Sequence, residues 1–277
     1  MDNYELLLNE HVFNLSDFAL FLSVMKVPRA YQCVLSIFME EPDIELEEVK
    51  VEQVILNKAG KRAIRLDAWA RSKDQRQFNM EMQNDSKSDD LRKRSRFYQS
   101  MIDTPILKSG KKTRYRNLPS TVIIFITQED IFGKDLAKYT FTERCKEVES
   151  LELEDGTTKI FLNMESKNGS QELISLLQYM KDTRIDNPNI VSKDSRILEL
   201  DEIVQEVKSS EEWEAVKMNI LEIGIQSGIE QGEKQKLTDQ VNKKLKKGCT
   251  VEEIADMLEE SVDTINEIVK TISAKKK

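Results

Sequence analysis

Two neighbouring stretches decide the fold: RAIRLDAWAR at residues 62–71 and QFNMEMQ at residues 77–83. Apolar and polar residues alternate in each of them, which is typical of a strand with one buried face. The polar link at residues 72–76 is short, so we expect the two strands to form an antiparallel hairpin, although the link lacks the Asn-Gly pair of a tight turn.

The predicted hairpin brings Asp67 beside Glu81. Because side chains alternate between the two faces of a strand, Glu81 and Gln83 share a face that the apolar side chains of their strand avoid. Two neighbouring carboxylates are most simply explained by a cation between them. Mg²⁺ is the simplest candidate, since it binds through one or two carboxylates and keeps its other waters for the substrate. An ordinary strand whose acidic side chains meet solvent is the alternative.

The hairpin and the segments after it resemble the recombination-promoting nuclease and transposase (Rpn) family, which belongs to the PD-(D/E)xK nuclease superfamily. The resemblance covers residues 10–165 and is specific from Asp67 to Asn163. It implies a mixed α/β fold with a restriction-endonuclease-like αβββαβ core. The segments that carry it besides the hairpin are RKRSRFYQSMID (92–103), VIIFI (122–126), FG (132–133) and GTTKIFLN (156–163).

The resemblance also implies a site. It makes Asp67, Glu81 and Gln83 the catalytic residues, with Asp67 and Glu81 holding Mg²⁺ or, alternatively, Mn²⁺. The superfamily usually has a lysine at the place of Gln83, whereas the Rpn-like group often has glutamine there. Glutamine can position a water molecule but supplies no charge. Positive charge and DNA contacts are then expected from the following helix, at Arg92, Arg94, Arg96 and Tyr98.

The distribution of charge favours a nucleic-acid partner near the hairpin. The net charge of −8 at first argues against one, because DNA binding requires Lys and Arg to neutralise phosphates. Locally the sign reverses, since residues 87–116 hold ten basic and three acidic residues. This stretch directly follows the carboxylate pair, where a metal nuclease would hold the phosphate backbone. DNA is therefore the expected partner, and a solvated helix face is the alternative explanation.

Several classes of site are poorly supported by the composition. His11 is the only histidine, so a two-histidine zinc site and a Ser-His-Asp triad have little support, and metal chemistry must use oxygen ligands. Cys33, Cys145 and Cys249 are far apart, which fits a reducing compartment. No run of 18 apolar residues and no secretory signal occurs, so we expect a cytoplasmic protein without a membrane span.

Periodicity predicts the other elements of a first domain, which we expect to cover residues 1–208. Glu10 or Asp17 of the first helix is a further candidate for the site, although Asp17 is better suited to helix capping. The expected helices are 4–25, 30–39, 90–107, 171–183 and 195–208, and the expected further strands are 46–57, 121–127, 139–145, 151–153 and 157–162.

The second predicted domain, residues 209–277, is all-α. Residues 211–247 contain no proline and predict a long helical arm with coiled-coil character. Gly224, Gly228 and Gly232 recur at every fourth position of this arm, and glycine is costly inside a helix. We expect the arm to self-associate, which would make the protein a homo-oligomer. A weak and mobile helix is the alternative.

Residues 250–272 predict two short helices, the first with a capping box formed by Thr250 and Glu253. These helices look like the helix-turn-helix of resolvase-type DNA binders. The second of them carries Asp263 and Glu267 and no arginine, so base recognition in DNA is doubtful. We therefore favour a helical hairpin that packs on protein.

Together these features predict a metal-dependent DNA endonuclease that hydrolyses phosphodiester bonds and acts in DNA recombination. The alternative is a catalytically inactive protein that keeps the nuclease fold and works in DNA binding or assembly.

Overall fold

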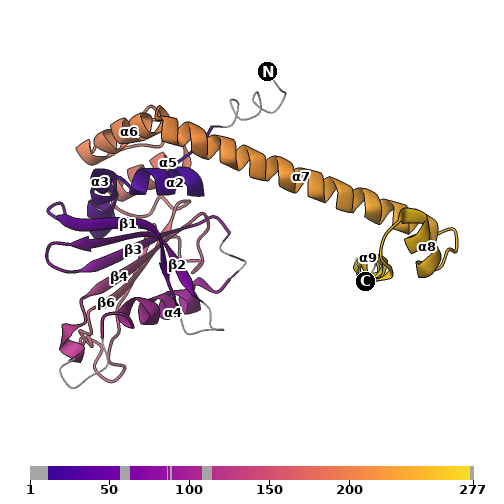
Figure 1. Cartoon of the computed structure of the whole chain (residues 1–277). Helices are drawn as coiled ribbons and strands as arrows, with labels where there is room; N and C mark the ends of the chain where they lie inside the picture. The colour runs from indigo at the N-terminus through magenta and orange to yellow at the C-terminus, as the bar shows by residue number, and fades with distance from the viewer. Residues whose placement is uncertain (1–11, 57–62, 86, 88, 108–113, 275–277) are drawn as a thin grey trace. The chain divides into compact units, whose positions relative to one another are not determined.

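The computed structural model describes residues 12–274 except 57–62, 86, 88 and 108–113. The chain divides into two compact units, with the division between Glu214 and Ala215. The first unit contains the sheet and its covering helices, and the second contains most of one long helix and two short ones (Figure 1).

A six-stranded mixed sheet forms the centre of the first unit, with the strand order β1-β2-β3-β4-β6-β5. The first three strands form an antiparallel meander, β3, β4 and β6 run parallel to one another, and β5 returns antiparallel to β6. This topology confirms the predicted mixed α/β class and the αβββαβ order of the core. The strands are β1 (Leu46–Ile55), β2 (Ile64–Ser72), β3 (Gln77–Gln83), β4 (Thr121–Thr127), β5 (Lys138–Phe141) and β6 (Thr157–Asn163).

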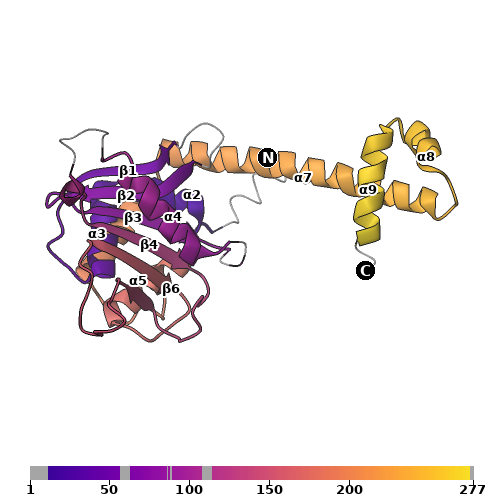
Figure 2. The same ribbon diagram turned by 90° about the horizontal axis from the view of Figure 1, so that it is seen from below.

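Helices cover both faces of the sheet (Figures 1 and 2). The helices α2 and α3 contact the meander, α5 and α6 pack on α3, and α4 packs on β4 from the opposite face. The helices are α2 (Phe18–Met25), α3 (Pro28–Met39), α4 (Leu91–Asp103), α5 (Gln171–Lys181), α6 (Ser195–Lys208), α7 (Glu211–Leu245), α8 (Val251–Leu258) and α9 (Val262–Ala274), with a short 3₁₀ turn at Tyr115–Asn117.

The strand β4 lies in the middle of this layered structure, and every residue of it is buried. Its sequence TVIIFIT is a continuous apolar and β-branched run, as expected for a strand that is covered on both faces. Phe125 of β4 stacks on Phe161 of β6, with ring centroids 5.6 Å apart. Tyr98 of α4 packs against the ring of Phe125. This aromatic layer fixes α4 over the carboxyl ends of β3 and β4.

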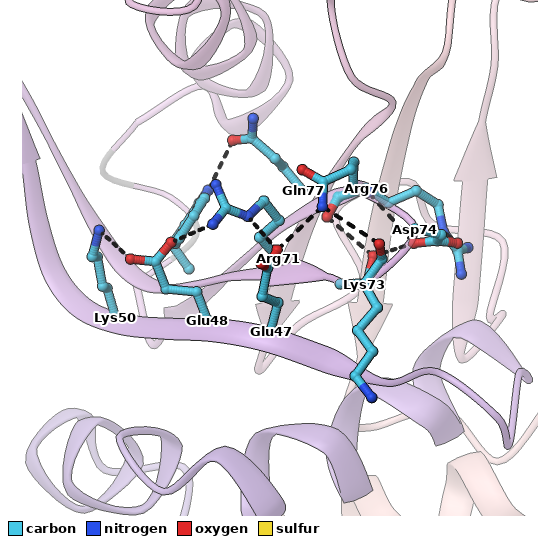
Figure 3. Close-up of polar contacts among 11 residues, drawn as sticks. Glu47, Glu48, Lys50, Arg71, Lys73, Asp74, Arg76 and Gln77 are labelled. Carbon is cyan, nitrogen blue, oxygen red and sulfur yellow. Dashed lines mark hydrogen bonds and ion pairs between the residues drawn. The ribbon is translucent and has the colours of Figure 1, made fainter.

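The link between β2 and β3 is held by local polar contacts rather than by a tight Asn-Gly turn. The amide of Ser72 donates to the carbonyl of Arg76 over 3.0 Å, and Gln75 adopts a left-handed backbone with φ of 68°. Asp74 accepts hydrogen bonds from Ser72 and Arg76 (Figure 3). On the neighbouring strands Arg71 contacts both Glu47 and Glu48, which ties β2 to β1. These contacts close the hairpin at one end and so help to set its register.

Two predicted elements are wrong in detail. Residues 12–17 are not helical, and the first described helix begins at Phe18, while the earlier part of the predicted helix lies outside the described residues. The Leu15 amide instead donates to Thr183 near the end of α5, and Asn14 bonds Asp17, so side chains replace helical bonds there. Residues 151–153 make only an isolated bridge to Arg144, because the antiparallel partner of β6 is β5.

The second unit contains most of the long helix α7 together with the two short helices α8 and α9. The expected capping box is present, since Thr250 accepts from the Glu253 amide and Glu253 accepts from the Thr250 amide. The turn after α8 uses Glu259 in a left-handed conformation, with φ of 57°, where glycine is the usual residue. A small apolar core joins the end of α7 to both short helices and includes Val241, Ile254, Ala255, Ile265 and Ile268.

Among the described residues, no single helix is long and apolar enough to cross a membrane. The helices α2 and α3 meet such a criterion only when they are taken together across a bend of 105°.

The Tyr31 side chain tests how the helical layer supports the hairpin. This fully buried residue of α3 lies with its hydroxyl 3.2 Å from the carbonyl of Ala68 and 3.3 Å from that of Phe78, one on each strand of the hairpin. We expect Tyr31→Phe to lower the free energy of unfolding by about 1–2 kcal/mol, because buried carbonyls lose a donor. Chemical denaturation measures the change. Tyr115→Phe, at a residue that is 83% exposed, is the matched control and should change little.

Candidate active site

The two predicted carboxylates lie side by side where the backbone ladder of β2 and β3 opens. The ladder runs from the Arg71 and Gln77 pair to the Ala68 and Met80 pair. At the next position side chains replace the backbone partners. The Asp67 amide donates to Glu81 Oε1 over 3.1 Å, and the Met82 amide donates to Asp67 Oδ2 over 3.2 Å. The hairpin thus brings Asp67 beside Glu81.

Both carboxylates are withdrawn from water. Glu81 is 0% exposed and Asp67 is 6% exposed. Burial raises the pKa of Asp67 to about 6, and it raises the pKa of Glu81 to about 8, with repulsion from Asp67 as the second cause. Hydrogen bonds and the nearby Arg94 oppose these shifts without cancelling them. The two groups therefore titrate as a pair near neutral pH, and they provide a strong potential for binding a cation.

One guanidinium group supplies the positive charge at this pair. Arg94, in the second turn of α4, donates to Glu81 Oε2 over 2.9 Å and to Gln83 Oε1 over 2.8 Å. It also donates to the hydroxyl of Tyr98 over 2.7 Å, and its planar group lies over the rings of Tyr98 and Phe125. Because α4 is capped by Asp90 and packed on β4, the helix presents Arg94 and Tyr98 to the carboxylates at a spacing of one turn.

Gln83 lies at the edge of the site. Its carbonyl oxygen accepts from Arg94, and its amide nitrogen donates to the Asp85 carbonyl over 2.6 Å. The amide therefore acts as a neutral acceptor that fixes the position of Arg94. Burial raises the pKa of Tyr98 to about 12, so its hydroxyl stays protonated at neutral pH.

The four residues predicted to contact DNA divide into two sets. Arg94 and Tyr98 point to the carboxylates, whereas Arg92 and Arg96 lie on the exposed side of α4. Arg92 is paired with Asp90 at the start of the helix, over 3.3 Å. The structure thus brings together Asp67, Glu81, Gln83, Arg94 and Tyr98, and it leaves Arg92 and Arg96 at the surface.

The donor set suits a hard divalent cation. Within the part of the chain that the structure describes, no group of three or more His, Cys, Asp or Glu side chains is arranged to hold a metal. Mg²⁺ needs only one or two carboxylates when water completes its coordination, so Asp67 and Glu81 fit. The unfavourable burial of two like charges is also an observation that a cation would explain. The outward oxygen of Glu81, however, is taken by Arg94.

Comparison with known proteins agrees with this geometry. The family model described as PD-(D/E)XK nuclease family transposase matches residues 32–276, which include the carboxylate hairpin, α4 and the C-terminal helices. The chain belongs to the PD-(D/E)XK nuclease family transposases. No curated protein and no solved structure matches it.

Sequence analysis did not identify two residues beside the carboxylates. Asn79 is fully buried and donates to Glu81 Oε1 over 2.8 Å, while its own Oδ1 has no hydrogen-bond partner in the described structure. Its signal was the two-residue spacing from Glu81 on the same face. Glu52 of β1 has a left-handed backbone, with φ of 51°, and its charge contributes to the raised pKa of Asp67. Nothing in the local sequence marks that conformation.

Asp17, one of the two acidic candidates of the N-terminal segment, forms its contacts within that segment. Asp17 accepts a hydrogen bond from the Asn14 amide over 2.7 Å and gives the N-cap position of α2. Glu10 lies outside the described residues, as does His11.

The paired carboxylates predict a particular pH dependence of stability in the presence of a chelator. Because both folded-state pKa values lie above the ordinary values, the folded protein binds protons that the unfolded chain has released, and stability falls as pH rises from about 4 towards 8. Asp67→Asn keeps an acceptor for the Met82 amide and removes one charge. We expect it to raise the free energy of unfolding at pH 8 by about 2 kcal/mol and to change it little at pH 4. Urea denaturation at both pH values is the measurement, and an equal effect at both would contradict the prediction.

Proposed function

We propose that this protein is a divalent-metal-dependent DNA endonuclease. The observation that carries the proposal is the buried pair of Asp67 and Glu81 beside the guanidinium group of Arg94. Membership of the PD-(D/E)XK nuclease family transposases supports nuclease chemistry in general. The metal dependence, the DNA substrate and the cleavage within a strand are the further steps of the proposal.

Asp67 and Glu81 would hold Mg²⁺ or Mn²⁺. When bound, such an ion polarises the scissile phosphate and lowers the pKa of an attacking water molecule. The protein's own residues orient the reaction. Asn79 and the Asp67 amide fix one oxygen of Glu81, and the Met82 amide fixes one oxygen of Asp67, so both carboxylates are held in place before a ligand arrives.

Gln83 and Arg94 together would perform the work of the lysine that most superfamily members have. A neutral amide at position 83 can accept from a guanidinium group, and the contact of 2.8 Å shows that it does. Arg94 then supplies the positive charge that can stabilise charge on a phosphate. The phenolic hydroxyl of Tyr98 holds the guanidinium group from the other side.

The DNA backbone would lie along the exposed face of α4. Arg92, Lys93 and Arg96 are exposed there, within the most basic part of the sequence. Such contacts release counterions, so binding should weaken steeply with salt. The three cysteines are all free, which supports our placement of the protein in the reducing cytoplasm.

A catalytically inactive DNA-binding protein is the second candidate, and one observation favours it. Arg94 occupies the oxygen of Glu81 that a metal ion would need, and position 83 carries no charge. Cleavage assays separate the two candidates directly.

We expect purified protein to nick supercoiled plasmid in the presence of Mg²⁺ or Mn²⁺ and to lose this activity with a chelator. Asp67→Asn and Glu81→Gln should each lower the nicking rate roughly 100-fold or more, because they remove charge at the reacting centre. Asp74→Asn is the matched control, since this carboxylate of the same hairpin has a side chain that is 58% exposed and pairs with Arg76. Gel electrophoresis of the plasmid measures the rate. Equal nicking by all four proteins would point to a contaminant and refute the proposal.

The long helix supports a second part of the proposal, namely that two copies pair through α7. Residues 211–222 hold four acidic and one basic residue, whereas residues 234–245 hold four basic and one acidic residue. Met218 in the acidic half and Ile223 directly after it are 47% and 61% exposed. An antiparallel arrangement centred near Gly228 would place the acidic half of each helix beside the basic half of the other. A partner helix would also offset the cost of the glycines in this segment.

Light scattering after size exclusion tests the pairing of α7. We expect a mass of twice 32.1 kDa for the wild type, decreasing with salt because opposite charges attract across the contact. Ile223→Glu should shift the protein towards the single-chain mass, since it buries a charge in the contact. Val191→Glu is the matched control, because Val191 is also 61% exposed but lies in the first unit. A wild type that is monomeric at low salt would refute the pairing.

A further inference from the structure

The side chain of Arg94 occupies the position that a metal ion would take. Its guanidinium group contacts Glu81 Oε2, the outward oxygen of the buried carboxylate. The inward oxygen, Oε1, already accepts from the Asp67 amide and from Asn79. Glu81 therefore has no oxygen that can bind a metal ion without bringing that ion next to Arg94.

A divalent ion and a guanidinium group at one carboxylate oxygen repel each other strongly, because both are cationic and water is excluded from Glu81. The two cations thus compete for Glu81. Metal binding therefore requires Arg94, whose side chain is 23% exposed, to withdraw from Glu81.

An arginine that leaves Glu81 keeps only neutral partners. The carbonyl of Gln83 and the hydroxyl of Tyr98 still accept its hydrogen bonds, but neither carries a charge. The guanidinium group then lacks an anion, and a phosphodiester is the anion that a planar fork of donors binds best. Gln83 and Tyr98 keep the group near the carboxylates while it exchanges one anion for another.

We propose that Arg94 couples metal binding to DNA binding: it neutralises Glu81 when neither ligand is present, and it binds a DNA phosphate once a divalent ion holds Glu81. The inference rests on the proposed function, because it uses Asp67 and Glu81 as the metal site. Its consequence is reciprocal. Metal raises the affinity for a phosphate backbone, and the phosphate raises the affinity for metal by the same factor.

The coupling would serve the chemistry of a nuclease. Without DNA the site is occupied by its own arginine, so metal binds weakly and water is not activated. A phosphate backbone on α4 removes Arg94 from Glu81 and opens the outward oxygen. The same arginine then lies against the phosphate, where positive charge is needed.

The test measures Mn²⁺ affinity from the free-ion electron paramagnetic resonance signal, with and without a short duplex that contains non-cleavable phosphorothioate linkages. We expect the duplex to lower the Kd for Mn²⁺ about tenfold in the wild type. Arg94→Gln should bind Mn²⁺ more tightly than the wild type without DNA, and the duplex should no longer change its Kd. A duplex with uncharged methylphosphonate linkages should leave the wild-type Kd unchanged, because it offers no anion to Arg94.

Arg92→Gln is the matched control on the same helix. Its side chain is 67% exposed and pairs with Asp90 rather than with Glu81. It should weaken DNA binding through the loss of a phosphate contact, yet the duplex should still lower the Kd for Mn²⁺ about tenfold once the DNA site is saturated. The control separates a specific role of Arg94 from the general attraction between a basic surface and DNA.

Several results would overturn the inference. The wild type is itself a test that does not depend on the folding of any variant: absence of coupling in the folded wild type refutes the inference. The inference is also refuted if the duplex lowers the Kd for Mn²⁺ of Arg94→Gln by the same factor as in the wild type, or if Arg94→Gln no longer binds Mn²⁺. If any of these results is found but the wild type still nicks plasmid in a reaction that needs metal and Asp67, the coupling is refuted and the proposed function is not. If the wild type binds no Mn²⁺ and does not nick, the proposed function falls together with the inference.

Discussion

Two carboxylates of like charge lie at opposing positions of one hairpin, and both are buried, so their mutual repulsion and their loss of water must be offset within a small volume. The surrounding structure does this with a few fixed donors. Backbone amides of each strand bond the carboxylate of the other, and one guanidinium group lies on the outward oxygen of Glu81. The aromatic contacts of α4 with β4 and the polar contacts of the hairpin link hold the segments that carry these groups in place.

Buried side chains on both faces of the sheet support the hairpin that carries the carboxylate pair. On one face Tyr31 of α3 bonds the carbonyls of both strands, and on the other Phe125 and Tyr98 hold the guanidinium group of Arg94. Neighbouring Glu52 adopts a left-handed backbone within a strand, which is a strained conformation for a residue with a side chain. A protein that tolerates strain and buried charge at one place gives up stability for function there.

The C-terminal unit has a different kind of stabilisation. Its three helices share a small apolar core, and its longest helix carries opposite charges at its two halves. The second short helix carries Asp263 in its first turn and Glu267 one turn later, which does not suit a DNA groove. The family model, which spans residues 32–276, includes residues of both units.

The sequence alone determined most of the elements. Period-two alternation indicated which residues of 64–72 and 77–83 share a face, and the short link indicated a hairpin, so Asp67 could be expected beside Glu81 without coordinates. The continuous apolar run of β4 and the capping box at Thr250 were equally local signals. Contacts between segments that are far apart in the sequence could not be predicted from such local signals. That Arg94, rather than Arg92 or Arg96, lies on Glu81 depends on the angle at which α4 packs on β4, and that Glu52 faces Asp67 depends on the pairing of β1 with β2. Only the tertiary structure decides such choices, because Arg94 lies on a different side of the helix from Arg92 and Arg96, and packing selects the side that faces the sheet.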